Sequence, residues 1–110
     1  MTDERPEVSD ATDRKRYEIG VGGELAGFTQ YTDTGARRIF FHTEIDDRFA
    51  GQGLASALVS RALEDTRSAG LRIVPVCPYV ARYVKKHHGF DDALDPVTPE
   101  ALAAVRAAQG

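Results

Sequence analysis

Cysteine, tryptophan and long apolar runs are scarce or missing in this sequence of 110 residues. The single cysteine, Cys77, rules out an internal disulfide and a cysteine-based zinc cluster. No apolar run approaches membrane-spanning length, and Met1–Arg5 lacks the basic and apolar regions of a secretory signal, so we expect a cytoplasmic protein with no membrane partner. An excess of positive charge is missing too: the net charge of -3 argues against nucleic acid as a ligand. Partners are therefore expected among small molecules.

Length and composition indicate one ordinary globular domain. A chain of 110 residues that is 42% hydrophobic and 28% charged can bury one modest core. The first 13 residues, MTDERPEVSDATD, are acidic, polar and contain a proline. We predict a disordered acidic tail over residues 1–13 and a single domain over residues 14–110.

Alternating apolar residues predict a β-hairpin followed by a third strand. The alternating runs 17–21 and 24–31 flank a Gly22-Gly23 turn, and residues 37–45 form the third strand. Alternation puts two sets of side chains on opposite faces of that strand: Ile39, Phe41, Thr43 and Ile45 on one, and Phe40, His42 and Glu44 on the other. A polar strand face can simply be solvated, but Phe40 on the face of His42 and Glu44 favours a covered site. This pair lacks a third metal ligand, so no metal site is expected.

Helical spacing marks the second half of the chain. Apolar residues recur every four positions over residues 51–69, which predicts an amphipathic helix ended by Gly70. Residues 71–76 read as a buried strand, and a strand-helix-strand order implies that it runs parallel to residues 37–45. A helix is predicted over Pro78–His88, ended by Gly89, and another begins at Thr98-Pro99-Glu100. The predicted fold class is therefore α/β of the α+β kind, a mostly antiparallel sheet with one parallel strand pair and flanking helices.

Two details of the helix over residues 78–88 bear on function. Its expected buried stripe consists of Tyr79, Val80, Tyr83, Val84 and His87. The basic cluster 85–88 suits the negative end of the helix dipole, with contact to a bound phosphate as the alternative.

The run Arg48–Ala55, RFAGQGLA, is typical of a loop that holds an anion. Glycines at 51 and 53 let backbone N–H groups approach a phosphate without a Cβ in the way. A helix that begins near Gly53 adds its positive dipole end, and Arg48 can supply a cation on the rim. Gly-x-Gly before a helix also occurs in plain turns, so the loop alone leaves both interpretations open.

Two prolines near Cys77 indicate that it lies between the end of a strand and the start of a helix. Pro75 has no N–H and must interrupt the strand ladder, which predicts a wedge between the two parallel strands. Pro78 is a favoured first helical residue, so the Cys77 thiol is expected at a helix start, where the dipole favours the thiolate. A buried, unreactive cysteine is the alternative.

Together these residues resemble the GNAT N-acetyltransferase superfamily, whose Gln/Arg-x-x-Gly-x-Gly/Ala loop grips the pyrophosphate of acetyl-CoA. The segments that carry the resemblance, including a narrower one to the short YjdJ-type branch, are His42–Ile45, Arg48–Val59, Pro75–Val80 with Tyr83, and Gly89-Phe90. The resemblance implies a reduced acetyl-CoA-binding fold with the pantetheine in the wedge. In two places the chain departs from the family. Lys85 stands where many members have a tyrosine that protonates the leaving thiolate, and Gly22-Gly23 replaces helices that shape the acceptor pocket.

The function expected from the sequence is that of an acetyl-CoA-dependent N-acyltransferase with an unknown amine acceptor, either a small molecule or a protein. The resemblance implies that acetyl-CoA is held by Ile45, Arg48, Gly51, Gln52, Gly53, Leu54 and Ala55. The candidates for chemistry are Cys77, Glu44 and His42, with transfer either direct or through an acyl-cysteine. A non-catalytic acyl-CoA-binding or sensing module is the alternative. A Rossmann-like nucleotide binder is a weaker one, because Ser56 stands where its third glycine would fall.

Overall fold

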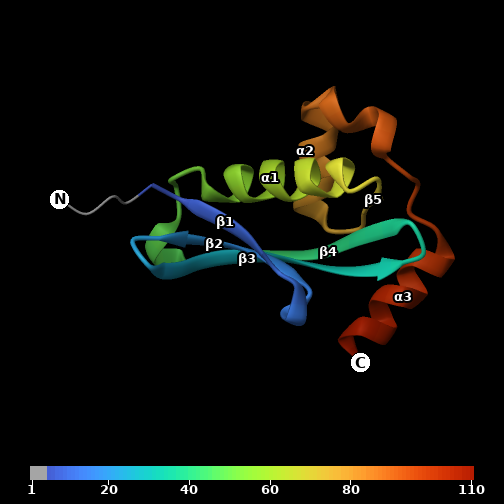
Figure 1. Cartoon of the computed structure of the whole chain (residues 1–110), viewed down its shortest axis with the longest axis horizontal. Coiled ribbons are helices and arrows are strands. Elements are labelled where there is room, and N and C mark those ends of the chain that lie inside the picture. The colour runs from blue at the N-terminus through green and yellow to red at the C-terminus, as the bar shows by residue number, and fades with distance from the viewer. Residues whose placement is uncertain (1–4) are drawn as a thin grey trace.

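In the computed structural model, which describes residues 5–110, five strands form one sheet in the order β1-β2-β3-β4-β5 (Figure 1). Their bounds are Glu7–Ala11, Arg16–Val21, Glu24–Thr34, Arg37–Ile45 and Arg72–Pro75. The first four strands pair antiparallel, and β4 pairs parallel with β5. The predicted fold class is confirmed.

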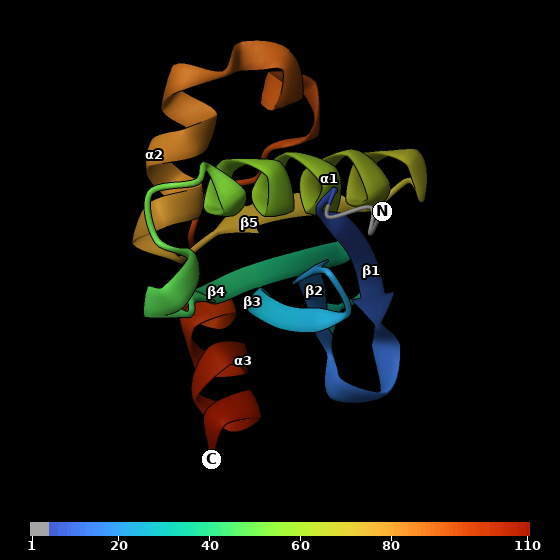
Figure 2. The same ribbon diagram turned by 90° about the vertical axis from the view of Figure 1, so that its left-hand side faces the viewer.

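Helices cover both faces of this sheet. Helix α1 (Leu54–Ser68) and helix α2 (Pro78–Lys86) lie on one face, and α3 (Pro99–Gln109) lies on the other (Figures 1 and 2). The main core fills the space beneath α1 and α2, and a smaller core under α3 contains Ile39, Val74, Ala101 and Val105. Within the described residues, no helix combines the length and apolar character needed to cross a membrane.

Helix α2 is shorter than the sequence predicts. It ends at Lys86 rather than His88, because His87 has an extended backbone (φ -119°, ψ 98°). A short 3-10 helix over His88–Ala93 follows, so Gly89 lies inside that turn and does not end α2. The side chain of His87 is exposed, so its predicted place in the buried stripe is wrong.

The predicted disordered tail is wrong for residues 7–11, which form β1. This strand pairs with β2 along its whole length, from Glu7 opposite Gly20 to Ala11 opposite Arg16. Backbone pairing to a sheet edge needs few apolar side chains, so composition alone gave no sign of it. Residues 1–4 of the predicted tail lie outside the described residues.

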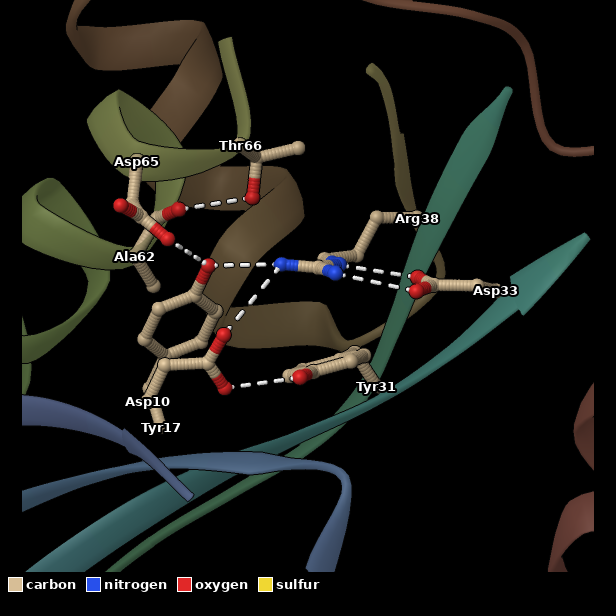
Figure 3. A network of polar contacts seen from close by, with 8 residues as sticks. All are labelled: Asp10, Tyr17, Tyr31, Asp33, Arg38, Ala62, Asp65 and Thr66. Carbon is tan, nitrogen blue, oxygen red and sulfur yellow. Dashed lines mark hydrogen bonds and ion pairs between the residues drawn. The ribbon is translucent and has the colours of Figure 1, made fainter. Parts of the chain in front are cut away.

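A polar network then fastens β1 to the rest of the domain (Figure 3). Asp10 of β1 accepts a 2.7 Å hydrogen bond from the Tyr31 hydroxyl, and its other oxygen lies 3.8 Å from Arg38 Nη1. Arg38 also donates to the Tyr17 hydroxyl at 2.7 Å, and that hydroxyl donates to Asp65 of α1 at 2.5 Å. Burial raises the pKa of Tyr17, as does its hydrogen bond to Asp65, so the phenol remains a donor. The network joins four strands to α1.

A β-bulge in β4 overturns the predicted division of its faces. Gln30 of β3 pairs with His42 and Tyr31 pairs with Phe40, which leaves Phe41 unpaired. Phe40 is fully buried in the α1 core, whereas His42 lies on the opposite face with its ring beside Phe28. The prediction that Phe40, His42 and Glu44 share a face is therefore wrong.

Candidate functional site

The parallel strand pair opens into a wedge at its carboxyl end. Strand β5 stops at Pro75, which pairs with Phe40, while β4 continues to Ile45. The last backbone hydrogen bond between β4 and the chain that follows β5 runs from the Cys77 N–H to the Phe40 carbonyl oxygen, at 2.8 Å. Among the described residues, β4 from Phe41 to Ile45 pairs with no strand on the side that faces β5, while His42 to Ile45 pair with β3 on the other side. That free side can accept another extended chain.

The loop after β4 leads into α1 with backbone angles that favour glycine. A 3-10 turn over Asp47–Phe49 is followed by Gly51 at φ +81° and Gly53 at φ +72°. Gly53 is the N-cap of α1, and no side chain caps the helix there. A Cβ built on either glycine would meet no atom within 4 Å, so the surface outside the loop is open. A helix start that no side chain caps, next to open space, suits a phosphate.

Arg48, the cation that the sequence predicts for the rim of this loop, is exposed and already has acidic neighbours. Its guanidinium lies 3.3 Å from an Asp46 oxygen and 3.5 Å from a Glu24 oxygen. Hydrogen bonds from the Arg48 backbone N–H and side chain hold the pKa of Asp46 below its ordinary value. An anion in the loop would therefore share Arg48 with two carboxylates.

Cys77 is the N-cap residue of α2, the position that the sequence predicts. Its side chain is 4% exposed, and its Sγ lies 3.3 Å from the Thr43 hydroxyl oxygen. Thr43 in turn lies 2.9 Å from the buried Thr29 hydroxyl. The β4 side chain that lies beside the Cys77 thiol is therefore that of Thr43, a residue to which the sequence analysis assigned no role.

His42 and Glu44 form a pair of their own. The Nε2 of His42 lies 3.2 Å from Oε1 of Glu44, and the side chains are 46% and 62% exposed. They lie across β4 from the Cys77 thiol, on the face that carries Phe28. Within residues 5–110, no three His, Cys, Asp or Glu side chains gather closely enough to hold a metal ion.

A cavity between α1 and α2 brings together residues that sequence reasoning did not combine. Its volume is about 540 Å³, and it is lined by Ser56, Tyr79, Arg82, Tyr83, Lys85, Lys86 and His87. Burial raises the pKa of Tyr79, so this phenol stays neutral. The sequence does contain a signal for this cavity. Tyr79 and Tyr83 are four residues apart, and Arg82 precedes Lys85 and Lys86 by three and four residues, so helical spacing brings the members of each set together.

Comparison with known proteins agrees with this geometry. Residues 16–93 match the family model described as GCN5-related N-acetyl-transferase. The solution NMR structure of a GCN5-like protein from Staphylococcus aureus has a similar fold, with a TM-score of 0.64, 18% identity, and coverage of 90% of this chain and 95% of that one. The crystal structure of Ard1 from Thermoplasma volcanium is also similar, with a TM-score of 0.50, 22% identity, and coverage of 68% of this chain and 54% of that one. No curated protein matches the sequence.

Proposed function

This chain belongs to the GCN5-related N-acetyltransferase family, and on that premise we propose that it transfers an acetyl group from acetyl-CoA to an amine. The observation that carries the proposal is the free side of β4 from Phe41 to Ile45, which leads directly to the uncapped start of α1. A molecule with an amide-bearing arm and a diphosphate can pair with the first and place its charge on the second.

In this proposal the pantetheine arm pairs with the main chain around Ile45, and the diphosphate lies on the loop. The loop residues that hold it are Arg48, Gly51, Gln52, Gly53, Leu54 and Ala55. Support comes from the positive φ angles of Gly51 and Gly53 and from the open space outside both. The finer assignment to the short YjdJ-type branch is also part of the proposal, and it rests on the motifs at residues 42–45 and 75–80.

Direct transfer is the first of two chemical routes. The amine nitrogen attacks the thioester carbonyl carbon, a C–N bond forms, and the C–S bond breaks to release CoA as a thiolate that then takes up a proton. Glu44 or His42 accepts the proton that the nitrogen loses. Their exposed face beside Phe28 supports this role, because an acceptor can approach them from solvent.

Transfer through Cys77 is the second route. Its thiolate attacks the thioester carbonyl, CoA leaves as a thiolate, and the amine then takes the acyl group from Sγ. The position of Cys77 at the start of α2, hydrogen-bonded to β4 where β5 ends, supports this route. Its burial beside Thr43 favours direct transfer instead, since the thiol has little access to solvent.

Intact mass spectrometry of the protein after incubation with acetyl-CoA, alone and with a pool of amines, tests the proposal. Direct transfer yields an acetylated amine and an unmodified protein. The cysteine route adds one acetyl group to the protein, and Cys77→Ala abolishes that addition. Binding of CoA without any transfer indicates a non-catalytic acyl-CoA-binding module, and no binding at all refutes the proposal.

Glu44→Gln distinguishes a general base from a surface carboxylate. Loss of a base lowers the transfer rate roughly 100- to 10,000-fold while CoA binding persists. Glu64→Gln, which removes an exposed carboxylate of α1, is the matched control. An unchanged rate in Glu44→Gln would show that Glu44 is a solvated surface residue and takes no part in proton transfer.

A further inference from the structure

The cavity between α1 and α2 has a strongly basic lining. Arg82, Lys85, Lys86 and His87 contribute to it from α2 and its end, and no carboxylate lines it. We propose that this cavity binds the 3′-phosphate of the adenosine portion of CoA and so makes the protein prefer CoA to 3′-dephospho-CoA. This inference rests on the proposed function, because it concerns the far end of the same cosubstrate.

Within residues 5–110, the arginine and lysine side chains that line the cavity have no carboxylate partner. Among the described residues, none of Arg82, Lys85 and Lys86 has a carboxylate within 4.0 Å, whereas most of the arginines elsewhere in the fold are ion-paired. An ion-paired cation has its charge largely satisfied, and an unpaired one can bind a phosphate without first losing a partner. Three such cations around one cavity indicate an anionic ligand.

The cavity lies close to the loop Arg48–Ala55, which holds the diphosphate in the proposed function. Ser56, which lines the cavity, lies in the first turn of α1, three residues after Gly53. A diphosphate held at the start of α1 would carry its ribose within reach of this wall. In CoA that ribose bears a further phosphate, which can meet the cations of α2.

The remaining lining suits the adenine base. The rings of Tyr79 and Tyr83 supply apolar surface, and the His87 ring centroid lies 4.3 Å from that of Tyr83. Aromatic faces of this kind accept a nucleobase by stacking. A cavity with rings and cations side by side therefore matches a nucleoside phosphate better than it matches an inorganic anion.

Charge at the negative end of α2 explains only part of this arrangement. Lys85 and Lys86 lie in the last turn, where cations stabilise any helix. Arg82 lies in the middle of α2, where the dipole gives no such benefit, yet it lines the same cavity. The dipole therefore does not account for the cluster as a whole.

Titration calorimetry with CoA and with 3′-dephospho-CoA tests the proposal. We expect the protein to bind CoA about tenfold more tightly, since each partly exposed ion pair contributes a factor of about five or less. The double variant Arg82→Gln/Lys86→Gln should bring that ratio close to one and leave the affinity for 3′-dephospho-CoA nearly unchanged. Arg106→Gln, which removes an exposed cation from α3, should keep the full ratio.

The outcomes separate this inference from the proposed function. Equal affinity for the two ligands, or a ratio that survives the double substitution, overturns the inference alone. A clear ratio without acetylation of any amine supports the inference and refutes the catalytic proposal. Failure of both ligands to bind overturns both.

Discussion

Substitution of Gly53 by valine gives the sharpest test of the phosphate loop. Gly53 has φ +72°, a conformation that a β-branched residue adopts only under strain. The strain amounts to about 1–3 kcal/mol, which the chain either bears or relieves by turning the amide away from the phosphate. If the amide turns away, the loop presents fewer N–H groups to the phosphate; if the chain bears the strain, the folded state loses that amount of stability.

The expected loss can be worked out from the hydrogen bonds involved. A hydrogen bond to a charged group contributes about 1.5–3 kcal/mol, so one lost amide weakens CoA binding roughly 10- to 150-fold. At about 4 °C for each kcal/mol, the strain alone should also lower the melting temperature by about 4–12 °C. Calorimetry measures the first effect and thermal unfolding measures the second.

Gly70 provides a matched control at the other end of the same helix. It has φ +78°, and a Cβ built on it would likewise meet no atom within 4 Å. Gly70→Val should therefore cost similar stability, but the whole length of α1, about 22 Å, separates it from Gly53, so CoA affinity should stay unchanged. Equal CoA affinity in Gly53→Val and the unmodified protein would remove the loop from the site. An equal loss of affinity in both variants would show that the effect is general destabilisation.

Three further predictions concern reactivity and stability. CoA should protect Cys77 from alkylation, because the thiol lies beside Thr43, on the part of β4 that the proposal assigns to the pantetheine. Equal alkylation rates with and without CoA, together with full transfer by Cys77→Ser, would show that Cys77 is a packing residue. Gly27→Ala should destabilise the fold by about 1–3 kcal/mol in urea unfolding, since the new Cβ would lie 2.5 Å from the Glu44 carbonyl oxygen and closer still to the Ile45 side chain; unchanged stability would contradict this close approach. Hydrogen bonds from two arginines hold the pKa of Asp95 below its ordinary value of 3.8. Its contribution is therefore present above pH 4 and lost as the pH falls further, so the stability difference from Asp95→Asn should shrink in acid, and a constant difference would contradict the argument.

Elements with a strong local pattern could be predicted from the sequence. Four-residue spacing of apolar side chains located α1, and the strand-helix-strand order implied the parallel pairing of β4 with β5. The cap residue Thr98 was equally clear, and its side chain accepts a hydrogen bond from the Ala101 N–H at 3.1 Å. The helix and its cap are decided by residues close together in the chain, and the parallel pairing is decided by the order of the elements.

Features that depend on a distant partner were missed. The bulge at Phe41 exists only in the pairing of β4 with β3, so alternation within β4 could not show that Phe40 and His42 lie on opposite faces. Strand β1 is held by pairing to β2 and by side chains such as Tyr31, and the polar composition of residues 7–11 concealed it. The basic cavity needed the placement of α2 beside α1.

The free side of β4 also raises a problem of selectivity between partners. Unpaired backbone groups on a strand attract any extended chain, including a strand from a second copy of the protein. Two features described above limit such pairing. Pro75 offers no N–H at the closed end of the wedge, and the bulge at Phe41 bends β4 away from the regular geometry that a long strand requires. The irregularities that open the sheet to a narrow, flexible ligand thus also protect it from aggregation through its own edge.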